Sequence, residues 1–122
     1  MSYFTAPNVP VEHDGNTVWI VPKIGQGINA RIHANIRLKM FGLVPTDDIY
    51  SNAVLRNCIV KWQGPMFEGE NGKPVPCTPE NIDVIPLDDP LMVKALEKIS
   101  ELNRKPEEIL PVVEPDENDP NG

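Results

Sequence analysis

The chain has 122 residues, of which 40% are hydrophobic, and its formal net charge is -7. This length predicts one domain with a modest core, and no apolar run approaches the ~20 residues of a membrane-spanning helix. The start lacks the basic region and apolar stretch of a signal peptide, so we expect a soluble, cytoplasmic protein. Cys58 and Cys77 lie far apart with no Cys-x-x-Cys, which indicates neither a zinc site nor a disulfide framework.

The negative charge is concentrated at the C-terminal end. From Pro106 onward there is no Lys or Arg, and the acids are Glu107, Glu108, Glu114, Asp116, Glu117 and Asp119. The rest of the chain is nearly neutral, which argues against a nucleic-acid groove lined with Lys and Arg. Frequent prolines and few apolar residues predict that residues 105–122 are disordered. This tail either only solubilises the protein or carries a short linear motif at residues 109–113.

The N-terminal residues predict a flexible arm followed by a strand. Residues 1–15 are polar and broken by Pro7 and Pro10, so we expect the single folded domain to cover residues 16–104. A turn is predicted at His13–Asn16. The β-branched and aromatic residues 17–21 predict a strand, which Pro22 ends or confines to a sheet edge.

Residues 28–40 fit two periodicities. They alternate apolar and polar, as a strand does, while one side of a helix would present Ile28, Ile32, Ile36 and Met40. Periodicity alone therefore does not decide between a strand and a helix. The preceding Gly25-Gln26-Gly27 lacks the partners of a phosphate loop and is interpreted as a turn. His33 lies on the polar side in either case, as a solvated surface histidine.

The next segment predicts a core helix from Thr46 to Trp62. Thr46 is a suitable N-cap, and Asp47 and Asp48 favour the first turn. Apolar residues recur with helical spacing up to Trp62, and Gly64-Pro65 provides the stop. Cys58 lies within the apolar stripe and is interpreted as a small buried hydrophobe rather than a nucleophile.

Residues 62–91, here called the connector, are rich in proline and glycine. We therefore expect turns, rather than a hydrogen-bonded ladder, to determine the course of the chain in this segment. A tight turn is expected at residues 70–73 between two short hairpin arms. Thr78-Pro79 and Asp89-Pro90 each place a capping residue before a proline, which predicts helices over residues 79–84 and from Pro90 to about residue 103. The inward face of the second helix comprises Leu91, Ala95, Leu96, Ile99 and Leu102.

No group of residues indicates catalysis. Helix capping explains the paired acids at residues 47–48 and 88–89 better than acid–base chemistry or magnesium binding does. The chain has only two histidines, no plausible triad and no metal-ligand spacing. We therefore expect a non-enzymatic protein without a cofactor or metal.

The order of motifs in the second half resembles the tail assembly chaperone-like proteins of long-tailed, siphovirus-type bacteriophages. The pattern is an aliphatic run closed by Trp62, a Gly64-Pro65 step, a turn, the helix start at residues 76–81 and a final amphipathic helix. It spans residues 17–103 and is strongest over residues 54–103. The resemblance implies a small α+β domain, with an N-terminal strand or hairpin and three to four helices, and it favours a helix over residues 27–38.

The resemblance also implies a function. Such a protein acts without catalysis in the host cell cytoplasm, binds the phage tape measure protein, and helps tail-tube proteins assemble along it. Self-association stays open. The alternative is a structural tail or head-tail adaptor that remains in the virion. We expect the exposed side of the connector and the last helix to meet the client, through Trp62, Pro65, Met66, Phe67, Leu91 and Leu96.

Overall fold

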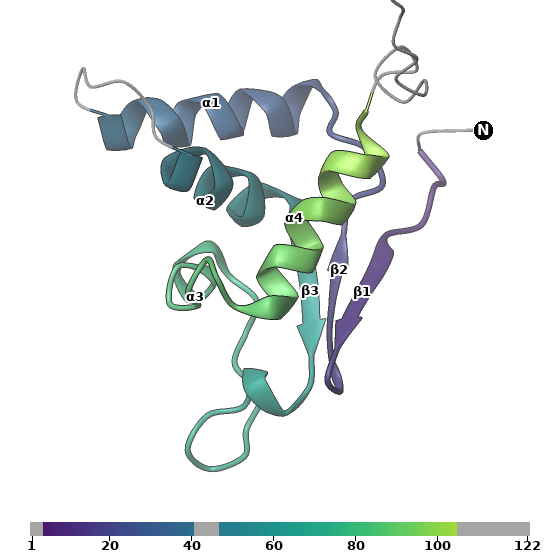
Figure 1. The fold of residues 1–122 in the computed structure, drawn as a ribbon, viewed down its shortest axis with the longest axis vertical. Helices are drawn as coiled ribbons and strands as arrows, with labels where there is room; N and C mark the ends of the chain where they lie inside the picture. Colours follow the sequence, from purple (N-terminus) through teal and green to yellow (C-terminus); the bar gives the residue numbers. More distant parts are fainter. Residues whose placement is uncertain (1–3, 41–46, 105–122) are drawn as a thin grey trace, which may run out of the picture.

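The structure is a computed structural model that describes residues 4–40 and 47–104. It confirms the predicted α+β class: helix α4 crosses one face of a three-stranded antiparallel sheet of order β1-β2-β3 (Figure 1). The elements in chain order are β1 (Val9–His13), β2 (Asn16–Ile20), α1 (Gln26–Met40), α2 (Asp47–Cys58), β3 (Ile59–Gln63), a 3₁₀ turn (Pro65–Phe67), α3 (Pro79–Ile82) and α4 (Pro90–Leu102).

Strands β1 and β2 form a tight hairpin at the predicted turn. Asp14 (φ 54°) and Gly15 (φ 82°) both lie in the left-handed region. His13 pairs with Asn16, so two residues form the loop. This is the geometry of an Asp-Gly type I′ turn, whose twist matches that of the flanking strands.

The prediction of a flexible arm over residues 1–15 was wrong for residues 9–13, which form β1. Val11 pairs with Val18 and is only 9% exposed. Pro10, interpreted from sequence as a breaker, is exposed on this edge strand, where its missing N–H costs no interior ladder hydrogen bond. Residues 9–13 of the predicted arm are therefore part of the sheet.

Residues 26–40 form a helix, as the resemblance favoured. Ile32 and Ile36 are buried on the side of α1 that packs against α2, whereas His33 is exposed as expected. The four-residue spacing of the isoleucines, and not the two-residue alternation, describes the buried face.

The predicted helix from Thr46 to Trp62 was wrong in its second part. Helix α2 ends at Cys58, and the next five residues form β3, which pairs with β2 through Val18↔Trp62 and Trp19↔Lys61. Residues 59–63 contain two β-branched residues and a tryptophan, so a strand also suits them locally, and pairing with β2 decides between the two structures. Thr46 lies outside the described residues.

Both predicted proline-started helices are present. The Thr78 hydroxyl accepts a hydrogen bond from the Asn81 N–H at 3.2 Å, which caps α3, although this helix ends at Ile82 rather than at residue 84. The Asp89 carboxylate accepts from the N–H groups of Leu91 (3.0 Å) and Met92 (3.4 Å) and caps α4. The predicted disordered tail, residues 105–122, lies outside the described residues.

The core lies between α4, α2 and the sheet. Helix α4 contacts β1, β2 and α2, and it buries Leu91, Met92, Ala95 and Ile99. The other buried apolar residues are Val11, Val18, Ile20, Ile32, Ile36, Ala53, Val54, Leu55, Cys58, Ile59, Phe67 and Ile82. Phe67 thus extends this core into the connector.

Candidate partner-binding surface

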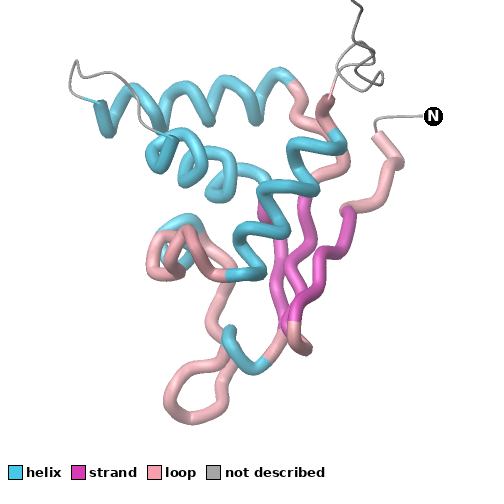
Figure 2. The backbone as a smooth tube through the Cα atoms, viewed as in Figure 1, coloured by secondary structure: helices cyan, strands magenta, loops and turns pink. Residues whose placement is uncertain are grey.

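The first half of the connector is organised by an aromatic pair. The rings of Trp62 and Phe67 are stacked, with centroids 4.3 Å apart and planes 10° from parallel. The indole N–H of Trp62 donates to the Val75 carbonyl at 2.7 Å, and the Val75 N–H donates to the Phe67 carbonyl at 2.7 Å. These contacts hold both arms of the loop against β3, although Figure 2 shows the stretch as mostly irregular.

A close backbone approach fixes the point where the connector leaves β3. Gly64 has φ 137°, and a Cβ added to it would lie 2.4 Å from Asn16 Oδ1 and 2.9 Å from the Gly15 carbonyl oxygen. The same Asn16 oxygen accepts from the Met66 N–H at 2.9 Å. The β1–β2 turn therefore seats the 3₁₀ turn directly, and only glycine fits at position 64.

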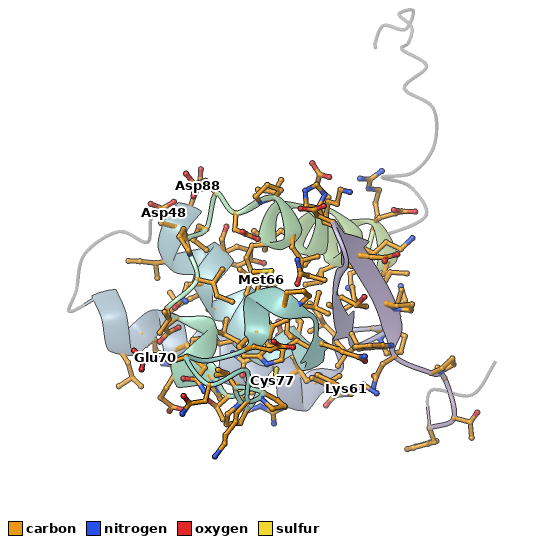
Figure 3. The ribbon with its side chains drawn as sticks, turned by 90° about the horizontal axis from the view of Figure 1, so that it is seen from below. Asp48, Lys61, Met66, Glu70, Cys77 and Asp88 are labelled. Carbon is orange, nitrogen blue, oxygen red and sulfur yellow. The ribbon has the colours of Figure 1, made fainter. Side chains whose placement is uncertain are left out.

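The tip of the connector is the expected short hairpin. Gly69 N–H donates to the Lys73 carbonyl at 2.8 Å, and Glu68 pairs with Pro74 in an antiparallel bridge. Figure 3 views the molecule from the connector end and labels Met66, Glu70 and Cys77 there. The tip is polar and exposed, so it offers little apolar surface.

The six predicted partner-binding residues do not form one exposed patch. Phe67 (4% exposed) and Leu91 (1% exposed) are core residues, which corrects the expectation that Phe67 is displayed. Trp62 is partly buried beneath the loop by its stacking contact. Pro65 and Met66 (37% exposed) remain at the surface of the connector. Leu96 is partly buried at a different place, on α4.

Leu96 lines an open groove of about 360 Å³ between α2 and α4, here called the α2–α4 groove. Its apolar part comprises Ile24, Val54, Leu96 and Ile99, and its polar part comprises Tyr50, Ser51, Ser100, Asn103 and Arg104. Two of its lining residues are joined, because the Ile24 N–H donates to Asn103 Oδ1 at 2.8 Å. Sequence reasoning found Leu96 but missed the groove, because three distant segments contribute to it.

The described residues show no group arranged for chemistry. They contain no cluster of three or more His, Cys, Asp or Glu that could hold a metal ion. Burial raises the pKa of the Cys58 thiol to about 11, which keeps it protonated near neutral pH and unreactive. No helix within these residues is long and apolar enough to cross a membrane.

Comparisons of the chain with protein-family models, curated proteins and solved structures found no match. The function proposed below therefore rests on the motif order in the sequence and on the surface just described.

Proposed function

We propose that this chain is a non-catalytic tail assembly chaperone of a long-tailed bacteriophage, which binds a helical segment of the tape measure protein and assists tail-tube assembly. The single observation that supports this most directly is the α2–α4 groove, whose lining combines apolar and polar side chains. An amphipathic helix binds such a groove by inserting apolar side chains spaced three or four residues apart.

The size and openness of the groove suit temporary binding. A volume of about 360 Å³ accommodates few side chains, so each contact contributes modest affinity. A chaperone must release its client when tube subunits replace it, and modest affinity at each site permits this exchange. The exposed Pro65 and Met66 lie on the connector and form a second, smaller candidate contact.

The experiment is co-expression of the chain with the tape measure protein from the same genome, scoring the soluble fraction of the client. The chain should raise this fraction and co-purify with the client. Leu96→Asp places a charge in the α2–α4 groove and should abolish both effects. Val93→Asp is the matched control, because Val93 lies on α4, is 40% exposed and does not line the groove.

Other outcomes identify a different site or function. If Met66→Asp abolishes client solubility while Leu96→Asp does not, the client binds the connector and the groove assignment is wrong. If the wild-type chain leaves client solubility unchanged and is found in purified virions, it is a structural adaptor. Phe67→Asp is unsuitable for this experiment, since a charge at a buried position would unfold the domain.

A further inference from the structure

Helix α1 presents an exposed basic face. Arg31, His33 and Arg37 are exposed, and residues 26–40 include no Asp or Glu. Among the described residues the ion pairs are Arg56–Asp83 and Lys98–Glu101, so neither Arg31 nor Arg37 has a carboxylate partner there. The face thus carries unneutralised positive charge on a protein whose net charge is -7.

This face lies outside the side of α1 that packs on α2. The element contacts of α1 are made chiefly with α2, through the side that buries Ile32 and Ile36. Figure 1 shows α1 on the outside of the molecule, with α2 beneath it. Helical spacing places Ala30 and Ala34 between Arg31 and Arg37, so an extended segment lying over the alanines would have an arginine on either side.

The last described residues lie close to the start of α1, and an acidic segment follows them in the sequence. The Ile24–Asn103 hydrogen bond (2.8 Å) fixes the C-terminal end of α4 two residues before the first residue of α1. Residues 106–119, here called the acidic segment, begin four residues after the end of α4 at Leu102, beyond Asn103, Arg104 and Lys105, and contain six acids with no Lys or Arg. From Arg104 to Asp119 an extended chain spans ~50 Å, whereas α1 is only ~22 Å long. The segment therefore reaches every part of the basic face.

We propose that the acidic segment binds the outer face of α1 within the same molecule, through its carboxylates and Arg31 and Arg37. A short connection gives an effective concentration in the mM range, which favours this arrangement over contact with a second copy. Net repulsion between two chains of charge -7 acts in the same direction. Helix α4 competes poorly for the segment because Glu97 and Glu101 alternate with its lysines.

The test uses the full chain with a nitroxide label on Asn118→Cys, in a Cys77→Ser background in which Cys58 stays buried. Amide signals of residues 30–38 are compared with the label oxidised and reduced. At about 0.02 M salt, where the Debye length is ~20 Å, these amides should lose more than half of their intensity. At about 0.5 M NaCl, where the length falls to ~4 Å, the intensity should return.

Charge-reversal variants locate the contact. Arg31→Glu with Arg37→Glu should restore the α1 signals at low salt, because both positions are exposed and the fold should persist. Lys73→Glu with Lys94→Glu makes the same change in net charge at exposed sites away from α1 and should leave the loss intact. The proposal is overturned if the loss is absent, spreads evenly over the surface, or survives reversal of the α1 arginines.

A mixed sample separates one molecule from two. Spin-labelled chain without isotope is added to isotope-labelled chain without a spin label at the same total concentration. The proposal predicts full α1 intensity in this mixture. Loss of α1 intensity there would show that the segment binds a second copy, which overturns the intramolecular assignment.

Discussion

Gly64 is the residue at which the addition of a single methyl group should destabilise the fold most. Its φ of 137° is strained for any other residue, and an added Cβ would meet the Asn16 side chain and the Gly15 carbonyl. We expect Gly64→Ala to lower the free energy of unfolding by at least about 2 kcal/mol, measured by urea denaturation. Gly25→Ala is the control, because nothing lies within 4 Å of its Cβ position. Equal losses in the two variants would contradict this.

The buried thiol of Cys58 should make the stability of the protein fall at alkaline pH. Burial raises its pKa from 9.0 to about 11, so the folded state holds the thiol proton more tightly than the unfolded state does. The resulting stability is complete below pH 9 and is lost as the pH rises through 11. We expect the unfolding free energy to fall by about 3 kcal/mol from this group.

The measurement compares wild type with Cys58→Ala by urea denaturation at several pH values. The variant is less stable at neutral pH because it leaves a cavity, but its curve lacks the thiol contribution. The difference between the two proteins should therefore shrink between pH 9 and 11. A constant difference would show that the thiol does not titrate as its burial implies.

At the scale of the element, the cap of α4 depends on one of two neighbouring acids. Asp89 accepts two backbone hydrogen bonds, whereas Asp88 is exposed and has no hydrogen bond among the described residues. Asp89→Ala should cost about 1 kcal/mol of stability, and Asp88→Ala should stay within about 0.5 kcal/mol of wild type. Thermal melts of both variants check this, and a larger loss for Asp88→Ala would contradict the assignment of the cap.

The elements that were predicted from sequence are those whose signals are local. The Asp14-Gly15 turn directly joins the two strands of the hairpin. Thr78 and Asp89 cap the helices that begin at the prolines immediately after them. The end of α2 was missed because residues 59–63 suit a helix or a strand, and pairing with β2 decides between them. The fold class allowed an N-terminal hairpin, but residues 9–13 were assigned to the flexible arm, because Pro10 is acceptable only at the edge position that β1 occupies.

The candidate surface was less predictable than the fold. Phe67 was expected to be displayed, but stacking on Trp62, five residues earlier, buries it. The α2–α4 groove combines the loop at Ile24 with two helices far away in the sequence, so only Leu96 was identified. Neither arrangement leaves a periodic pattern that a sequence alone would show.

For the whole molecule, stability should be unevenly distributed. Helix α4 packs against β1, β2 and α2, while α1 relies chiefly on α2 and buries Ile32 and Ile36 among its residues with described side chains. Segments with few buried contacts open locally at lower free energy than the core does. In native-state hydrogen exchange, the amides of α1 should therefore exchange faster than those of β2 and α4.

Two truncations of buried isoleucines test this division. Ile32→Ala should speed exchange in α1 much more than in β2, because α1 can detach while the sheet and α4 stay packed. Ile99→Ala removes a similar side chain from the centre of the core, so it should speed exchange in every element by lowering global stability by about 2–5 kcal/mol. If both variants speed exchange uniformly, α1 unfolds only with the whole domain, and the molecule is a single cooperative unit.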